Sequence, residues 1–528
     1  MISELKSAIR LAILPTILAI SATAQSPDQN IILTSLDQTI RIEGSLVDFD
    51  GTNYTINTSL GTLVVASAQL TCEGDACPYI KPPTSEFTVA GASAMGELLL
   101  PSLMQAYSGA LDAAFTVNSE DDEPTLVMTD IENDDIARVR VVSSTSSAGL
   151  VDLLQGDASI ALSTRPVRRR EVDTFRASDL GEIVDPSQEV VVALDGLLVV
   201  TSPINPVRAI SEPNAALVFA GRVQNWSQLG GSDAPINLYV RGSDSGTSEV
   251  FNNIIMRPQG LEILASAQVL ESDEAVSNAV AEDPNGIGFT SFVSRANAKP
   301  LAIEGVCGLQ TPPSEFTIKT EEYPLTRRLY MYRTAADAPL HVQEFMDFAI
   351  SSDAQAAVAS AGFVNQDVTQ ASVNSQGLRF ASAIVANRSA TDLPQLRQMV
   401  QDMLSSDRMS TTFRFNTGSS QLDNRALADV KRLAEIFTQP SFANKIVQLV
   451  GFTDSIGNPV LNRQLSQQRA QQVQDALLAA EPGLAGRVTI QALGYGEISP
   501  LGCNETLAGR NINRRVEVWV REDTARAQ

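Results

Sequence analysis

The sequence contains a single histidine, His341, among 528 residues. Ser-His-Asp and Cys-His catalytic sites each need an imidazole, and histidine-rich metal centres need several. A multi-histidine metal site is therefore excluded, and any histidine-dependent nucleophile would have to use His341. That residue precedes VQEFMDF, which has a helical pattern, so we interpret it as a helix-start residue. We expect a protein that is not an enzyme and that holds no cofactor or metal.

Cysteines are also few, with four in the chain. Cys72 and Cys77 flank the residues EGDA, and a disulfide between them would close a small loop. A C-x-x-x-x-C metal half-site is the alternative, but the sequence lacks a second half-site. Cys307 and Cys503 lie far apart in sequence. They could pair with each other or stay free, and the sequence leaves both possibilities open.

Long apolar runs are missing beyond the N-terminus, since no later run reaches the roughly 18 residues of a membrane-spanning helix. The first residues carry Lys6 and Arg10, the apolar run LAILPTILAISA and an A-T-A cleavage pattern at residues 22–24. This order is typical of a secretory signal peptide, which we place at residues 1–24. A short membrane anchor is disfavoured because the run is short and contains Pro15. No cysteine stands near the cleavage site, which disfavours a lipoprotein.

Basic residues are scarce, with 38 Lys and Arg against 61 Asp and Glu and a net charge of −23. This balance argues against nucleic acid as a partner, because phosphate backbones need a basic surface. The charge is unevenly distributed. From Ser405 to Gln528 the chain has 14 basic and 12 acidic residues, which leaves −25 for the residues before Ser405. The asymmetry indicates two functional parts.

The pattern of strands and helices predicts several domains. Residues 25–83 alternate apolar and polar residues between turns and predict a small β domain. Residues 84–368 alternate short apolar strands with helical stretches, as expected for an α/β domain with mainly parallel sheets. Residues 369–408 are interpreted as a connector. Residues 409–522 predict a compact α/β unit, including a helix over 462–480 whose buried face would contain Leu465, Val473 and Leu477.

Three strand-to-helix junctions in the α/β domain carry small polar residues. They are GASAMG (91–96), SSTSSAG (143–149) and LYVRGSDSGTSEVF (238–251). Free N–H groups at a helix start favour an anion, and Arg241 would add a guanidinium at a strand end. Helix capping by Ser and Thr is the ordinary alternative for any one of them. Their occurrence three times in one domain favours an oxyanion site.

The segments FTVAGASAM, FAGRVQNWSQLGG, YVRGSDSGTSEVF and PNGIGFTSF together resemble the periplasmic phosphate-binding proteins of ABC transporters. The resemblance covers about 280 residues. It implies a two-lobed type II periplasmic-binding fold, with an ABC permease as a possible partner. The implied first-lobe anion ligands are Ser93, the backbone at Ala94, Ser146 and Thr164. The implied second-lobe ligands are Arg241, Ser245, Gly246 and Thr247.

Two positions depart from that family's pattern, which usually has Asp where this chain has Thr164 and Ser243. Those carboxylates accept a proton from a protonated phosphate oxygen. Asp244 follows one residue later. Phosphate is therefore the leading ligand, and another oxyanion is the alternative.

The segment GFTDSIGNPVLNRQLSQQRA, with LAGRNINRRVEVWV after it, resembles the OmpA-type peptidoglycan-binding domain. The resemblance implies that Asp454 binds the ammonium and Arg469 the carboxylate of the diaminopimelate in the stem peptide, with Asn462 adding a hydrogen bond. An ordinary surface ion pair is the alternative for these two charges. Phe452 stands where the family has a histidine, and Asn416 stands where it often has an acidic residue. Arg514 and Arg515 fit the family's G-R-x-x-N-R-R-V motif, and we interpret them as structural or rim residues.

We therefore expect an exported periplasmic protein, associated with peptidoglycan and the outer membrane. Its two-lobed α/β domain would be preceded by a small β unit and followed by an OmpA-like α/β sandwich. It would bind phosphate or a similar oxyanion. The alternative is a structural envelope linker whose binding fold has lost its anion.

Overall fold

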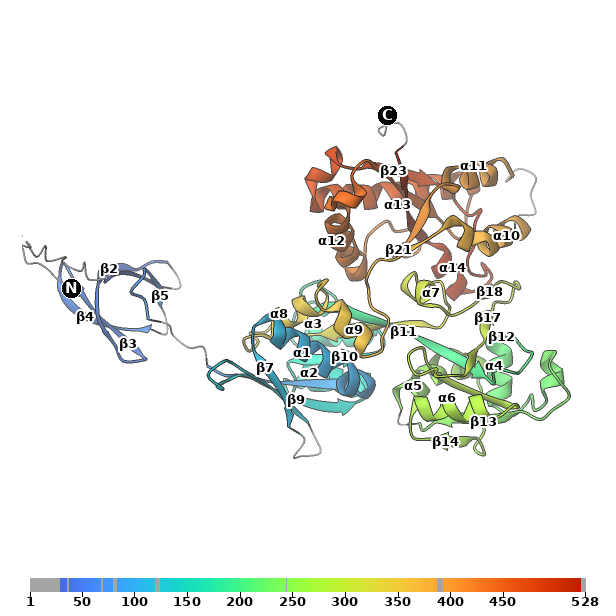
Figure 1. Cartoon of the computed structure of the whole chain (residues 1–528), viewed down its shortest axis with the longest axis horizontal. Helices are drawn as coiled ribbons and strands as arrows, with labels where there is room; N and C mark the ends of the chain where they lie inside the picture. The colour runs from blue at the N-terminus through green and yellow to red at the C-terminus, as the bar shows by residue number, and fades with distance from the viewer. Residues whose placement is uncertain are drawn as a thin grey trace, which may run out of the picture. The chain divides into compact units, whose positions relative to one another are not determined.

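The computed structural model describes residues 29–35, 38–67, 70–78, 83–118, 124–243, 245–386 and 393–523. The predicted signal peptide at 1–24 and Asp244 lie outside the described residues. The chain divides into two compact units, Met1–Pro83 and Thr84–Gln528. Each unit is described by itself (Figure 1).

The first unit is a five-stranded antiparallel sheet with the order β4-β3-β2-β1-β5. Its strands are β1 (Asn30–Ser35), β2 (Arg41–Phe49), β3 (Asn53–Thr58), β4 (Gly61–Ala66) and β5 (Leu70–Glu73). Alternating residues of β1 and β3 point inward, so Ile31, Leu33, Tyr54 and Ile56 form its core. Cys72 and Cys77 form the predicted disulfide at the end of β5.

The second unit begins with a large mixed sheet that builds two lobes. In the first lobe the parallel strands β10-β6-β9 are central. The second lobe contains the parallel strands β14-β13-β15. Their bounds are β6 (Ser85–Ala92), β9 (Asp135–Ser144), β10 (Ile160–Ser163), β13 (Asn237–Arg241), β14 (Gln268–Leu270) and β15 (Gly286–Ser291). A hairpin of β7 (Ala114–Asn118) and β8 (Thr125–Thr129) extends the first lobe beyond β9.

Two long antiparallel strands, β11 (Glu189–Thr201) and β19 (Thr326–Tyr332), join the lobes. The first half of β11 pairs with β19, and the second half of β11 pairs with β15. Strand β19 also pairs with β10. Figure 1 shows β11 running from one lobe to the other. The sheet is therefore mixed rather than mainly parallel. The sequence VVVALDGLLVVT is mostly apolar because β11 is buried along nearly its whole length, and the buried Asp195 within it pairs with Arg327.

Helices cover both lobes and pack on their sheets. The first lobe has η2 (Met95–Leu99), α1 (Leu100–Ala110), α2 (Ser146–Gln155), α8 (Val342–Ala349) and α9 (Gln355–Ser360), and the second has α4 (Glu212–Phe219), α5 (Gly246–Phe251) and α6 (Asp273–Glu282). His341 is the residue before α8, as predicted. Its Nδ1 lies 2.9 Å from Glu344 Oε2 and 3.0 Å from the Tyr107 hydroxyl. The histidine therefore has a structural role at this helix start.

The C-terminal part forms a sheet with the order β20-β21-β24-β22-β23. The strands are β20 (Gln370–Ala371), β21 (Asp407–Arg414), β22 (Lys445–Phe452), β23 (Thr489–Gly494) and β24 (Arg515–Glu522). Helices α12 (Asn424–Thr438) and α13 (Pro459–Ala480) pack on it. Stretch 369–408, interpreted as a connector, contains α10 (Gly377–Ala386) and α11 (Leu393–Met403), and Leu396, Met399 and Met403 of α11 join the core beside Trp519.

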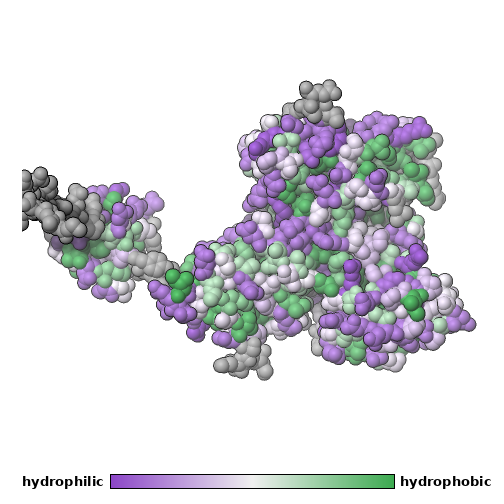
Figure 2. Space-filling model, viewed as in Figure 1, coloured by the Kyte–Doolittle hydropathy of each residue, from purple (hydrophilic) through white to green (hydrophobic). Residues whose placement is uncertain are grey.

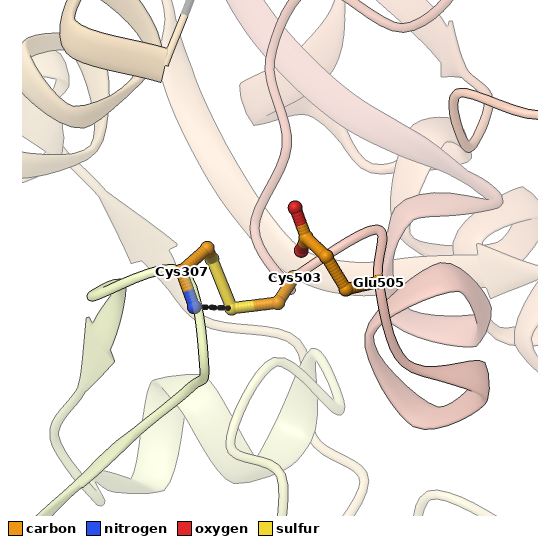
Figure 3. Close-up of side chains that lie close together, drawn as sticks. All are labelled: Cys307, Cys503 and Glu505. Atoms are coloured by element: carbon orange, nitrogen blue, oxygen red, sulfur yellow. Dashed lines mark hydrogen bonds between the residues drawn. A yellow bond between two sulfur atoms is a disulfide. The ribbon is translucent and has the colours of Figure 1, made fainter.

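The C-terminal part is joined covalently to the second lobe of the same unit. Cys307 and Cys503 form a disulfide, which settles the pairing that the sequence left open. Figure 3 shows Glu505 beside the two sulfur atoms. Because both sulfurs are already bonded to each other, this group does not offer thiolate ligands to a metal.

Hydrophilic and hydrophobic residues are intermixed over the second unit's visible face (Figure 2). Within the described ranges, each helix is too short or too polar to cross a membrane.

Candidate functional sites

The first-lobe residues predicted to bind an anion gather where β6, β9 and β10 end. Ser93 and Ala94 directly follow β6, and Ala92 of that strand pairs with Ser144 at the end of β9. Ser146 starts α2, where the Thr145 hydroxyl accepts a hydrogen bond from Ala148 N. These positions lie at the carboxyl edge of parallel strands, where α/β sheets bind ligands.

Ser146 and Thr164 are in direct contact. The Ser146 Oγ lies 3.3 Å from Thr164 Oγ1 and accepts a hydrogen bond from Thr164 N at 3.1 Å. Both residues are buried. Helix α2 can start this close to β6 because Gly149 has no side chain, and a Cβ there would stand 2.5 Å from Gly91 Cα. The sequence therefore places two hydroxyl groups side by side at this edge.

In the second lobe, Arg241 ends β13 and is held by an acid that the sequence analysis missed. Its Nε lies 3.1 Å from Asp273 Oδ1, and its Nη1 donates to Leu270 O at 2.8 Å. Thr247 Oγ1 donates to Asp273 Oδ2 at 2.8 Å. Burial raises the pKa of Asp273. The hydrogen bond from Thr247 and the nearby Arg side chains lower this pKa but do not outweigh burial. Asp273 is thus the residue that positions Arg241 and Thr247, two of the four predicted second-lobe ligands.

Ser245 caps α5, and its side chain accepts a hydrogen bond from Ser248 N at 3.2 Å. Gly246 and Thr247 open that helix, so all the predicted second-lobe ligands lie within one strand-to-helix junction. Among the described residues, no hydrogen bond or ion pair joins this second-lobe set to the first-lobe set. The structure therefore shows two polar half-sites, one in each lobe.

The C-terminal part brings Asp454, Arg469 and Arg514 together. Asp454 follows β22, and its Oδ2 lies 2.6 Å from Arg514 Nη1 in a buried ion pair. Its Oδ1 accepts a hydrogen bond from Ile456 N at 2.9 Å. Arg514 also donates from Nε to Phe415 O at 3.0 Å. The ion-pair partner of Asp454 is therefore Arg514.

Arg469 lies on α13 and is fully buried. Its Nε donates to Ser419 O at 2.9 Å and its Nη2 to Asn416 O at 3.1 Å, while Nη1 has no hydrogen-bond partner in the described part of the chain. Burial, together with the nearby charge of Arg514, lowers its pKa to about 10, although Asp454 opposes this shift. Arg469 therefore stays charged at neutral pH and keeps one donor free.

Asn462 completes this group from the same helix. Its Nδ2 donates to Asp454 O at 3.3 Å and to Glu497 Oε2 at 2.7 Å. Glu497 was not singled out from the sequence, although it stands in the loop after β23 that also approaches Thr453 through Gly496. Asn462 therefore contacts the two acidic residues Asp454 and Glu497, and Asp454 in turn pairs with Arg514 and lies near Arg469. This set is suited to a ligand that carries both an ammonium and a carboxylate.

The neighbouring Arg515 has a different environment from Arg514. Its Nε donates to Glu517 Oε1 at 2.6 Å, and its guanidinium lies 4.1 Å above the ring of Phe452. Glu517 is fully buried and also binds Arg379 of α10. Arg515 and Phe452 therefore hold the sheet and helix α10 together, whereas Arg514 belongs to the group around Asp454.

Residues 78–353 match the family model described as the PBP superfamily domain. The chain belongs to the PBP superfamily. Residues 414–514 match the model of the OmpA family. The predicted fusion of a phosphate-binding-protein-like domain with a C-terminal OmpA domain is confirmed, as is the α/β fold class.

Curated relatives fall into two groups that match different parts of the chain. The phosphate-binding protein PstS of Borreliella burgdorferi is 27% identical over 260 residues, which are 48% of this chain and 88% of that protein. Protein SphX of Synechococcus elongatus is 30% identical over 222 residues, 40% of this chain and 64% of its own length. Outer membrane porin F of Pseudomonas aeruginosa is 38% identical over 113 residues, 21% of this chain and only 31% of the porin.

Among solved structures, an ABC-type phosphate transport receptor from Vibrio cholerae is 21% identical. It covers 53% of this chain and 99% of its own chain, with a TM-score of 0.41.

Proposed function

We propose that this chain is an exported envelope protein whose two-lobed domain binds phosphate or a similar oxyanion and whose OmpA domain binds peptidoglycan. The observation that best supports anion binding is the half-site around Arg241. A guanidinium fixed by Asp273 stands at a strand end beside the helix start at Ser245. Fixed donors of this kind bind an oxyanion without having to be reorganised.

The second half rests on the group around Asp454. Diaminopimelate carries an ammonium and a carboxylate on one carbon. Asp454 and Glu497 would bind the ammonium, and the free Nη1 of Arg469 would bind the carboxylate. Anchoring to the wall would keep the anion-binding domain at a fixed place in the periplasm and raise its effective concentration there. An ABC permease that receives the ligand is part of this proposal.

A second candidate, a structural linker without an anion, is favoured by one observation. Asp273 already accepts hydrogen bonds from Thr247 Oγ1 and from Ser291 N, and it pairs with Arg241. In a linker these contacts would be the final state of the junction. In a binding protein the same contacts would orient the Arg241 guanidinium so that its remaining N–H groups face the ligand.

Calorimetric titration of the full-length protein with phosphate, and separately with sulfate, tests the two candidates. We expect saturable heat with phosphate and a loss of affinity of at least about tenfold in Arg241→Ala, because a charged hydrogen bond contributes about 1.5–3 kcal/mol. Arg295→Ala, which removes an arginine over the Phe292 ring, is the control and should bind as the wild type does. No heat with either anion at millimolar concentration would favour the linker.

A further inference from the structure

The space between the two lobes is open in this structure. A cavity of about 790 Å³ is lined by Thr164 of the first lobe and by Val250 and Asn253 of the second. A single oxyanion would fill only a small part of it, and in the described part of the chain no hydrogen bond or ion pair joins the two polar half-sites. Two-lobed binding domains close around their ligands by a hinge motion. An anion held by both half-sites therefore requires the lobes to move together.

The OmpA domain forms a third side of this cavity. Phe415, Asn416 and Leu422, from the loop after β21, are among the residues that line it. The same domain is joined to the second lobe by the disulfide between Cys307 and Cys503. A rigid domain beside a closing cleft can keep its place against one lobe only and must shift against the other. The covalent bond makes the second lobe the one with which the OmpA domain stays.

Helix α12 makes contacts with the first lobe. Asn424, the first residue of this helix, donates from Nδ2 to Val184 O at 2.9 Å and to Glu189 Oε1 at 2.8 Å. Two turns later Arg432 Nη2 donates to Ile350 O at 3.4 Å. Figure 1 shows α12 on the side of the OmpA domain that faces the first lobe. The OmpA domain therefore bridges the two lobes while they are apart.

The Asn424 contacts lie away from the point where the lobes meet. Strand β11 changes its pairing from β19 to β15 between Gly196 and Leu197. Glu189 is the first residue of the same strand, which places it roughly 20 Å from this crossing point at about 3.3 Å per residue. A contact so far from a hinge is displaced when the hinge rotates. We therefore expect Asn424 to lose its two acceptors when the lobes close.

We propose that α12 is an inhibitory latch that holds the two lobes of the anion-binding domain open. The contacts of Asn424 and Arg432 stabilise the open form and not the closed form, so they lower the fraction of molecules that is closed. The affinity for an anion that needs the closed form is reduced by the same factor. This inference rests on the proposed oxyanion-binding function and adds that the OmpA domain regulates the same site.

Titration calorimetry of the full-length protein with inorganic phosphate tests the latch. Asn424→Ala removes both hydrogen bonds of the amide and should tighten phosphate binding about fivefold. Asn424→Asp places a carboxylate beside Glu189 and Val184 O and should tighten binding at least as much. An acid in the first turn of a helix is favourable, so this variant should keep the fold of α12.

Gln471→Glu is the matched control, because it makes the same change of charge where the amide donates to Asp475 of its own helix. It should bind phosphate as the wild type does. Phosphate affinity that is unchanged or weaker in both Asn424 variants would overturn the inference while leaving the proposed function standing.

A second measurement follows the lobes without any ligand. The four cysteines form two disulfides, so cysteines introduced at exposed positions can be spin-labelled selectively. Suitable changes are Ala177→Cys at the end of α3 (Arg169–Ala177) in the first lobe and Asn278→Cys on α6 in the second. We expect one inter-label distance in the wild type and in Gln471→Glu, and a second population at another distance in Asn424→Asp.

This measurement separates the latch from the function on which it rests. A distance distribution in Asn424→Asp that is identical to that of the wild type would overturn the latch, whatever the protein binds. A shifted distribution in a protein that binds no phosphate would overturn the proposed function and leave the latch standing.

Discussion

At the scale of single residues, Glu321 carries much of the contact between the OmpA domain and the strand region that joins the lobes. It lies 2.5 Å from Arg328, 3.0 Å from Arg425 and 3.8 Å from Arg414. Burial disfavours its charged form, but these three guanidinium groups outweigh burial and lower its pKa well below the usual 4.5. Its ionised form is therefore stabilised only in the folded protein.

This arrangement predicts a stability that falls in acid. A carboxyl group whose pKa is lower in the folded state stabilises the fold fully above its unfolded pKa. For Glu321 this stabilisation is lost progressively as the pH falls below about 4.5. Glu321→Gln should lower the free energy of unfolding by about 3 kcal/mol at pH 7. The difference from wild type should shrink in urea unfolding at pH 3.5. Asp173→Asn, on an exposed pair with Arg176, should change little at either pH. A difference that is constant with pH would contradict the assignment.

The sequence predicts residues well where one short segment contains the whole pattern. Asp454, Asn462 and Arg469 stand in one stretch, and the structure brings them together around one loop. Asp273 and Glu497 could not be predicted this way. Each belongs to a helix start or loop far along the chain, and only sheet pairing brings it to its partner. The available signal for Asp273 was that it is an acidic residue at the start of helix α6, which follows β14, the strand paired with Arg241.

At the scale of elements, glycines decide how closely helix α13 approaches its sheet. A Cβ on Gly451 of β22 would stand 2.0 Å from Ser466 O, and one on Gly494 of β23 2.4 Å from Gln467 N. The helix therefore lies almost on the strands, and Ser466 is buried where the apolar spacing predicted Leu465, which is only partly buried. This close approach sets the position of Arg469 three residues after Ser466.

Gly451→Ala should push α13 away from β22, because the obstacle is backbone and cannot rotate aside. We expect a loss of about 3 kcal/mol in stability and reduced retention on purified peptidoglycan. Chemical denaturation and a sedimentation assay measure the two effects. Gly486→Ala is the control, because a Cβ there meets nothing within 4 Å. Normal stability and retention in Gly451→Ala would show that the helix can move without cost.

Element prediction from the sequence succeeded for most strands and helices and failed on how the sheet is connected. The apolar run of β11 indicated a buried strand, but its antiparallel pairing with β19 depends on a segment more than a hundred residues later. Likewise, α11 of the interpreted connector has an amphipathic pattern, and only the fold shows that it covers Trp519. Local patterns report burial, whereas the choice of partner is a long-range property.

At the scale of the whole molecule, the OmpA domain contacts both lobes of the binding domain within one unit. The disulfide Cys307–Cys503 joins it to the second lobe, and Asn424 Nδ2 donates to Val184 O at 2.9 Å in the first lobe. Arg432 adds a hydrogen bond to Ile350 O at 3.4 Å. The OmpA domain is therefore packed against both lobes and linked to one of them covalently.

Removing this covalent link should destabilise the second unit. The two cysteines are 196 positions apart, and a loop of that length gives a stabilisation of about 5 kcal/mol in the chain-entropy description. Scanning calorimetry of the Cys307→Ser, Cys503→Ser double variant should show a lower transition temperature for this unit. The Cys72→Ser, Cys77→Ser double variant is the control and should leave that transition unchanged, because its disulfide belongs to the first unit. An unchanged transition in the first variant would contradict a stabilising link.

The central claim is that one molecule holds a phosphate group and the cell wall at the same time. Sedimentation of the protein with purified peptidoglycan, in the presence of a radiolabelled phosphate compound, tests it directly. The wild type should carry label into the pellet, Arg241→Ala should sediment without label, and the Asp454→Ala, Arg469→Ala variant should leave both protein and label in solution. Wild-type protein that sediments with no more label than Arg241→Ala would contradict the claim, as would retention of the double variant on the wall.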